Sequence, residues 1–170
     1  RVLTTALNPI VSDINLLKEK YGPKRVGVVI GTSTSGISDG EKAMKFHLEH
    51  GKFPEKFHYG KQEIFSPSRY VSNWFNLKGP VFSVSSACTS GAKALASAAR
   101  LLRLGVCDAI IAGGVDTLCN LTIEGFSSLS VTTDGVCNPF SVNRKGINIG
   151  EGAALFLMTR EHSMVRLCGI

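Results

Sequence analysis

The sequence predicts an α/β fold in which helices cover both faces of a mixed, mostly parallel sheet. Short apolar runs are continuous rather than alternating, as in strands buried on both faces; they occupy 25–30, 81–85, 108–112 and 153–158. Segments with helical spacing of apolar residues separate these runs, which favours crossovers between parallel strands. With 170 residues the chain can bury a sizeable core, and we expect one domain over 1–170.

Helix signals surround the first of these strands. Apolar residues recur at helical spacing over 2–20, and Tyr21-Gly22-Pro23 predicts the end of that helix. After the strand, Ser38 and Glu41 have the spacing of a capping box. The pair predicts that a second helix begins there and runs to about residue 50.

Proline, alanine and glycine mark the central elements. Ser66-Pro67 offers an N-cap and a first-turn proline for a third helix. The alanine-rich run 92–104 predicts a fourth helix, with Gly105 as its C′ residue. Gly113-Gly114 is expected to close the strand over 108–112.

The last third of the chain is weaker in periodicity. A helix is expected over 117–126, and 132–148 reads as a loop because turn-forming residues are dense there. After the strand over 153–158, we expect 165–170 to begin another strand.

Composition excludes several classes of function. The net charge is +6, but the lysines and arginines are scattered, which disfavours a nucleic-acid surface and leaves attraction of an acidic protein open. No apolar run reaches the roughly 18 residues that span a membrane. The odd number of widely spaced cysteines argues against disulfides or a zinc ribbon and for a reducing compartment, the cytoplasm. They are Cys88, Cys107, Cys119, Cys137 and Cys168.

Cys88 is the strongest candidate for chemistry. It stands in Val84-Ser85-Ser86-Ala87-Cys88-Thr89-Ser90-Gly91-Ala92, between a predicted strand and a predicted helix. Unpaired N–H groups and the positive dipole end of a helix favour thiolate over thiol. From the local residues alone, two interpretations stay open: a nucleophile, or a structural cysteine packed as a small hydrophobe.

Other polar motifs favour structural roles. The loop 31–36 lacks the lysine of a P-loop and the glycine spacing of a dinucleotide fingerprint, so a turn lining a pocket is expected. His47, His50 and His58 lie close in sequence, but no carboxylate or cysteine completes a metal shell, and we expect solvated surface histidines.

Two carboxylates leave alternatives open. Asp116 either orients a group at a strand end or, as the simpler expectation, caps a helix. Glu151 is either catalytic or, as expected more strongly, a buried, hydrogen-bonded carboxylate that organises its loop. The flanking Gly150 and Gly152 suggest close approach of another backbone.

Three segments carry a resemblance when they are taken together and in order: Ala87–Ala92, Gly105–Asp116, and the run from Pro139 through Ala153. Asn120–Ser130, with Glu124-Gly125-Phe126, adds a fourth. The ordered set resembles the β-ketoacyl-acyl-carrier-protein synthases of the thiolase superfamily and covers nearly the whole chain.

The resemblance implies a thiolase-like fold, of which this chain is the first of two similar halves, and a condensing activity. Cys88 would accept an acyl group from the phosphopantetheine of an acyl carrier protein before decarboxylative condensation with the malonyl-carrier protein. Ala87, Thr34 and Phe126 would line the acyl pocket. The resemblance implies no cofactor and no metal, and a homodimer or a heterodimer with a related subunit.

Departures from the family pattern shape the remaining expectations. The family's two catalytic histidines belong to a later half, and its first, central strand precedes the helix that starts here. We therefore expect a fragment clipped at both ends and inactive alone. Ser141 and Ile147 stand where Asp and Phe are common. A non-catalytic chain-length-type subunit is the main alternative, and a cysteine hydrolase is disfavoured because no histidine has a suitable setting.

Overall fold

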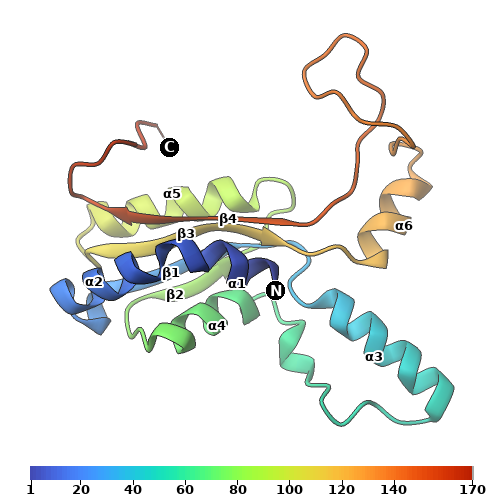
Figure 1. The fold of residues 1–170 in the computed structure, drawn as a ribbon, viewed down its shortest axis with the longest axis horizontal. Coiled ribbons are helices and arrows are strands. Elements are labelled where there is room, and N and C mark those ends of the chain that lie inside the picture. The colour runs from blue at the N-terminus through green and yellow to red at the C-terminus, as the bar shows by residue number, and fades with distance from the viewer. Residues whose placement is uncertain (170) are drawn as a thin grey trace.

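A computed structural model describes residues 1–169, and its centre is a four-stranded sheet in the order β2-β1-β3-β4 (Figure 1). The strands are β1 (Val26–Gly31), β2 (Val81–Val84), β3 (Ala109–Asp116) and β4 (Gly152–Thr159). β1 pairs in parallel with β2 and β3, whereas β4 runs antiparallel to β3. The prediction of a mixed, mostly parallel sheet is confirmed.

Helices form the connections that parallel pairing requires. Between β1 and β2 lie α3 (Ile37–His50), the 3₁₀ turn η3 (Tyr59–Lys61) and α4 (Ser66–Phe75). α5 (Ser90–Arg103) joins β2 to β3, and α6 (Asn120–Ser128) follows β3. As a result, β1, β2 and β3 all end at the same edge of the sheet.

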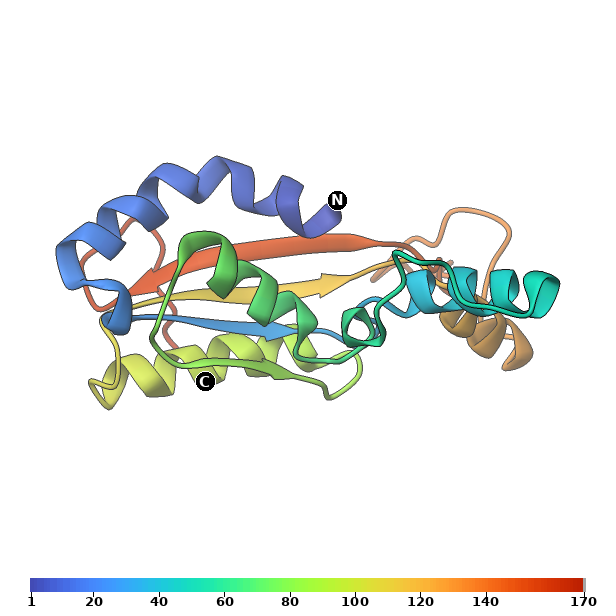
Figure 2. The same cartoon turned by 90° about the horizontal axis from the view of Figure 1, so that it is seen from below.

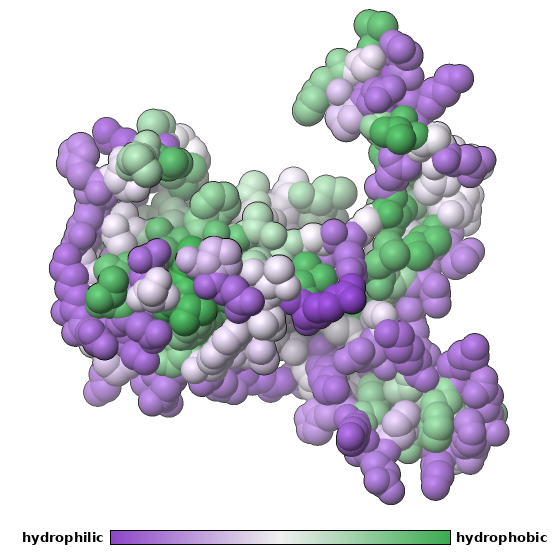
Figure 3. Space-filling view, viewed as in Figure 1, coloured by the Kyte–Doolittle hydropathy of each residue, from purple (hydrophilic) through white to green (hydrophobic). Residues whose placement is uncertain are grey.

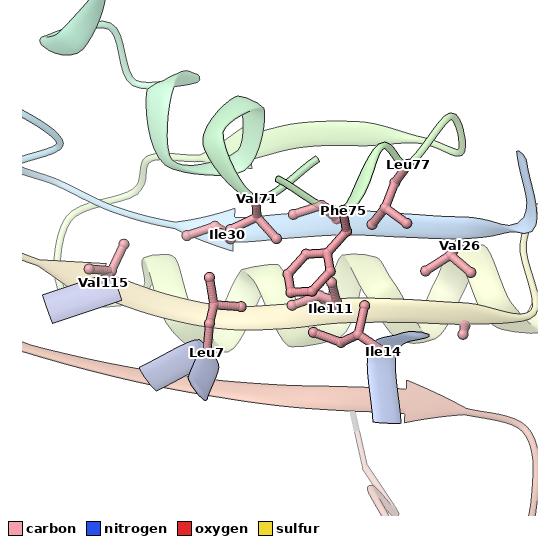
Figure 4. Packing of buried hydrophobic residues seen from close by; sticks show 11 residues of the cluster. Leu7, Ile14, Val26, Ile30, Val71, Phe75, Leu77, Ile111 and Val115 are labelled. Carbon is pink, nitrogen blue, oxygen red and sulfur yellow. The ribbon is translucent and has the colours of Figure 1, made fainter. Parts of the chain in front are cut away.

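One face of the sheet is covered by α4 and by the N-terminal helices α1 (Val2–Leu7) and α2 (Val11–Tyr21) (Figure 2). Figure 4 shows how their apolar side chains meet those of the strands over one cluster. Each large side chain buried there stabilises the fold by roughly 1.5–3 kcal/mol. The labelled members are Leu7, Ile14, Val26, Ile30, Val71, Phe75, Leu77, Ile111 and Val115.

The opposite face is covered by α5 (Figure 2). Ala94, Ala98 and Leu102 of this helix pack against side chains from the strands, among them Val29 and Ile110. Successive residues of a strand point to opposite faces, so Val29 serves this cluster while its neighbours serve the other. Helices therefore cover both faces, as predicted.

The N-terminal helix is interrupted rather than continuous over 2–20. A 3₁₀ turn, η1 (Asn8–Ile10), separates α1 from α2. Pro9 explains the break, because proline has no N–H to donate to the preceding turn. The end of α2 at Tyr21 agrees with the prediction, and Gly22 leaves the helix with a positive φ of 81°.

The expected end of the third strand at Gly113-Gly114 is wrong, because β3 continues through both glycines to Asp116. A Cβ on Gly113 would lie 2.0 Å from the carbonyl oxygen of Ala154 in β4. One on Gly114 would lie 3.4 Å from the Cα of Gly91 in α5. The glycines therefore permit close packing on both sides of β3 and do not terminate it.

The predicted capping box at Ser38 and Glu41 is not formed. Neither residue caps α3, which has no side-chain cap bond. The Glu41 carboxylate instead accepts hydrogen bonds from the backbone N–H groups of Asn120 (2.9 Å) and Leu121 (2.8 Å). A carboxylate at this position satisfies unpaired donors and complements the helix dipole. Glu41 of α3 therefore caps α6, which lies about 80 residues later in the sequence.

Of two further predicted helix ends, one is confirmed and the other is confirmed only in part. Gly105 follows α5 with a φ of +66°, as expected of a C′ glycine. Pro67 lies in the first turn of α4, as predicted, but Ser66 is already helical and its side chain makes no cap bond.

α3, α6 and the loop after α6 project beyond the end of the sheet (Figures 1 and 2). The loop holds one isolated bridge, between Thr132 and Ile147, and its Phe140 and Val142 side chains are fully exposed. Apolar side chains are visible over α6 and the loop in Figure 3. After β4, residues 165–169 form no strand, contrary to expectation, and Ile170 lies outside the described residues.

A charged cluster lies at the opposite edge of the sheet, where β1 and β3 begin and β4 ends. The Asp108 carboxylate accepts hydrogen bonds from Arg25 Nε (2.7 Å) and Arg160 Nη2 (2.6 Å). Arg25 also donates to the carbonyl oxygens of Val106 (2.9 Å) and Gly105 (2.8 Å), which follow α5. Mainly through its hydrogen bond, Arg25 holds the pKa of the Asp108 carboxyl below its usual value.

We expect Asp108→Asn to destabilise the full-length protein in a pH-dependent way. The folded-state pKa is lowered, so the stabilisation is complete above the unfolded pKa of about 3.9 and is lost as the pH falls through the folded value. Urea unfolding should show a deficit at pH 7 that shrinks below about pH 4. Asp134→Asn, on an exposed loop, is the control, and a deficit of equal size at pH 7 and pH 3 would contradict this account.

We expect Gly31→Ala to lower the free energy of unfolding by at least about 2 kcal/mol, because overpacking against immobile backbone costs this much. The added Cβ would lie 2.4 Å from the backbone carbonyl of Ser90 at the start of α5. Gly125→Ala in α6 is the matched control, since nothing lies within 4 Å of its added Cβ and alanine favours helix. Equal stability of the two variants in urea titrations would refute the expectation.

Candidate active site

Cys88 lies in the short turn between β2 and α5, and its side chain is exposed. The residue before it, Ala87, has a left-handed φ of 53°. Such a backbone conformation costs a non-glycine residue roughly 1 kcal/mol or more and persists only where its surroundings impose it.

Hydrogen bonds to Ser90 hold this turn in place. The Ser90 hydroxyl donates to the carbonyl oxygen of Ala87 (2.6 Å) and accepts from the N–H of Ser86 (2.9 Å). The Ser90 N–H also donates to the Ala87 carbonyl (3.0 Å), and the Thr89 hydroxyl donates to that of Ser86 (2.8 Å). Together with two further bonds between Ser86 and Thr89, these bonds hold residues 86–90 in the turn that presents the Cys88 thiol.

Glycines bring this turn against the sheet. Gly31, at the end of β1, leaves no side chain between the strand and the first turn of α5. Gly91 of α5 approaches Gly114 of β3 in the same way. The thiol therefore stands at the edge of the sheet where the parallel strands end, which is the usual place of ligand sites in α/β sheets.

An open pocket of about 390 Å³ occupies this edge. Ala87 and Cys88 form one wall, and Asp116 of β3 lies in the lining with Gly31 and Ala153. Of the segment 31–36, which was expected to line a pocket, Gly31 at the end of β1 lies in the lining, and residues 32–36 do not.

Thr34 and Phe126 are not in the lining of this pocket within residues 1–169. Thr34 is 4% exposed, and its hydroxyl donates to Asp116 Oδ1 (3.1 Å) and accepts from the N–H of Thr117 (2.8 Å). Phe126 lies half-buried on α6. Of the four predicted site residues, the structure brings Cys88 and Ala87 together at the pocket.

Asp116 takes the first of the two roles left open by the sequence, which is to orient a group at a strand end. It caps no helix; its Oδ1 accepts hydrogen bonds from the loop after β1, including the N–H groups of Ser33 (2.6 Å) and Thr34 (2.9 Å). The available signal was a carboxylate directly after a strand, facing a loop rich in Ser and Thr that follows the neighbouring strand.

Glu151 is not the buried carboxylate that was expected. Its side chain is 36% exposed and forms an ion pair with Arg1 (3.1 Å) and a long hydrogen bond with the N–H of Leu118 (3.4 Å). No other atom lies within 4 Å of a Cβ built on Gly150 or Gly152, so the expected close approach of another backbone is absent there.

No group of three potential metal ligands occurs among residues 1–169. His50 and His58 are exposed, as expected. His47 is half-buried instead: its ring stacks on Phe53, and its Nδ1 is buried with no hydrogen-bond partner among residues 1–169. No described helix is both long and apolar enough to cross a bilayer.

The five cysteines are all free, but their environments differ. Cys107 and Cys119 are buried, and burial raises the pKa of the Cys107 thiol. Cys137 is half-buried, and Cys168 is exposed beyond β4. Among them, only Cys88 borders the pocket at the strand ends.

Comparison with known proteins gives concordant results for sequence and fold. The family model described as beta-ketoacyl synthase, N-terminal domain, matches residues 1–163. Nodulation protein E of Rhizobium meliloti is 34% identical over 144 residues, covering 84% of this chain and 36% of the relative. A 3-oxoacyl-[acyl-carrier-protein] synthase homolog of Saccharomyces cerevisiae is 32% identical over 168 residues, covering 96% and 37%.

Solved structures extend the similarity. A ketosynthase from Xenorhabdus doucetiae, in complex with its chain length factor, matches with a TM-score of 0.88 and 38% identity over 95% of this chain and 41% of the other. A beta-ketoacyl synthase from Burkholderia phymatum matches with a TM-score of 0.77 and 26% identity over 91% and 40%. The chain thus spans well under half the length of these relatives. It has the thiolase-like fold of ketosynthases, and it belongs to the beta-ketoacyl synthase family, matching the N-terminal domain.

Proposed function

We propose that the protein containing this chain is a β-ketoacyl-acyl-carrier-protein synthase and that Cys88 is its nucleophile. The observation that carries the proposal is the exposed Cys88 thiol, held by a hydrogen-bonded turn at the start of α5 on the wall of a pocket. A thiol so placed can be reached by an acyl thioester, and the helix N-terminus favours its anion.

The proposed reaction has two stages. The Cys88 thiol loses its proton, and the thiolate attacks the carbonyl carbon of an acyl-carrier thioester. The carrier's C–S bond breaks, and its thiolate leaves and takes up a proton to become the free thiol. A malonyl-carrier thioester then loses carbon dioxide, and the resulting carbanion attacks the acyl-cysteine carbonyl. The Cys88 thiolate is released, and the product is a β-ketoacyl thioester two carbons longer.

The Cys88 backbone contributes a second function in this scheme. No acceptor within residues 1–169 takes its N–H, so the group is free to donate to the developing oxyanion. We place the second oxyanion donor and the two histidines that assist decarboxylation outside these 170 residues.

We also propose that an acyl carrier protein delivers the substrates. The net charge of +6 favours approach of an acidic partner, and the yeast relative's name includes acyl-carrier-protein synthase. The protein would act as a homodimer, or as a heterodimer like the Xenorhabdus ketosynthase with its chain length factor. Its five free cysteines support a cytoplasmic location.

The alternative is a non-catalytic subunit of such a heterodimer. Subunits of that type tend to replace the nucleophilic cysteine, whereas here Cys88 is retained and exposed. This favours the catalytic role.

Cys88→Ala should abolish condensation by the full-length protein, lowering the elongation rate by at least about a thousandfold, because no covalent intermediate can form. The measurement is the elongation of acyl-carrier substrates with malonyl-carrier protein, monitored by mass spectrometry. Cys168→Ala, which removes an exposed thiol outside the pocket, is the control and should retain activity. Near-normal elongation by Cys88→Ala would reject the assignment.

Thiol labelling gives a separate expectation. Brief treatment of the full-length protein with iodoacetamide should modify Cys88 before Cys107 and Cys119, because both of these are buried. The raised pKa of the Cys107 thiol slows its reaction further. Peptide mapping at successive times gives the order in which the cysteines are modified. Cys168 is exposed as well, so its modification rate shows how much of the Cys88 rate accessibility alone explains. Earlier modification of Cys107 or Cys119 would contradict the model.

A further inference from the structure

Asp116 concentrates an unusual number of hydrogen bonds on one atom. Its Oδ1 accepts from the N–H groups of Ser33 (2.6 Å) and Thr34 (2.9 Å) and from the hydroxyls of Thr32 (3.1 Å) and Thr34 (3.1 Å). A hydrogen bond to a charged group is worth more than one between neutral groups. The last residue of β3 therefore holds the loop that follows β1.

A second layer of bonds extends this connection. The Thr117 N–H donates to the Thr34 hydroxyl (2.8 Å), and the Thr117 hydroxyl donates to the carbonyl oxygen of Ser35 (3.1 Å). Within the loop, the Ser35 N–H donates to the Thr32 hydroxyl (2.9 Å). Ser35 has a φ of +44°, a conformation that this network must maintain.

Asp116 itself lines the pocket that contains Cys88. The loop it holds begins directly after Gly31, which lines the pocket and lies against the first turn of α5. Residues 32–35 do not line the pocket themselves, but they continue from Gly31 and are bonded to Asp116, so their displacement would move these two lining residues.

We propose that Asp116 is a positioning residue that fixes the loop 32–35 and thereby sets the width of the acyl pocket beside Cys88. The inference rests on the proposed function only in identifying the pocket's occupant as an acyl chain. All four donors meet at Oδ1, so an amide oxygen can replace it in part. Asp116→Asn should keep the loop in place, whereas Asp116→Ala should release it.

Two measurements on the full-length protein test the proposal. Hydrogen exchange reports the loop directly, because the Ser33 and Thr34 amides donate to Asp116. The ratio of Cys88 modification rates by decyl and methyl methanethiosulfonate reports the pocket. Asp108→Ala is the matched control, since it removes a well-bonded carboxylate beside the other end of β3.

In Asp116→Ala, amide exchange over 32–35 should rise at least about tenfold, the equivalent of one lost hydrogen bond. The decyl-to-methyl ratio should rise at least about threefold, because a released wall admits the longer chain. Asp116→Asn should stay within about threefold and Asp108→Ala within about twofold of wild type in both readouts.

Unchanged exchange or an unchanged ratio in Asp116→Ala would overturn the proposal. Equal changes in Asp108→Ala would also overturn it, since they would show general destabilisation. Neither readout requires turnover. If the variants give the expected exchange and labelling pattern but the wild-type protein forms no acyl-Cys88, the proposed function alone is contradicted. If the wild-type protein elongates acyl chains but Asp116→Ala changes neither readout, the Asp116 assignment alone is contradicted.

Discussion

The close contact between the first turn of α5 and the end of β1 determines where the Cys88 thiol lies. Gly31 has no side chain, so the backbone at Ser90 can approach the strand to a distance that any Cβ would prevent. Gly91 and Gly114 repeat this contact at β3. Because the helix begins directly over the sheet edge, the residue two before it, Cys88, stands at the strand ends and not over the buried face.

The pocket beside Cys88 depends on two kinds of support. On the Cys88 side, backbone approach and the hydroxyl of Ser90 hold the turn. On the opposite side, a charged oxygen of Asp116 holds the loop after β1. Sheet and helix thus fix the Cys88 thiol, while a polar network, which a single substitution can weaken, holds the loop next to the pocket.

The sequence predicted the elements whose signals are local. The apolar runs, the helix after Cys88 and the C′ glycine at 105 depend on neighbouring residues and were found as expected. The roles of Glu41 and Asp116 depend on partners about 80 residues away, so their local capping patterns were misleading. Gly113-Gly114 looked like a strand end because its reason, the close approach of β4 and α5, exists only in the folded chain.

Cys107 shows what a structural cysteine requires in this fold, and the contrast bears on Cys88. Cys107 is buried beside β3 among apolar side chains, where burial disfavours its thiolate. Cys88 is exposed, follows Ala87 in a left-handed conformation, and depends on a glycine contact for its position. Packing alone gives no reason to maintain a strained backbone around an exposed thiol. The proposed role of Cys88 as a nucleophile does, because a thiol that must reach a substrate has to be exposed beside the pocket.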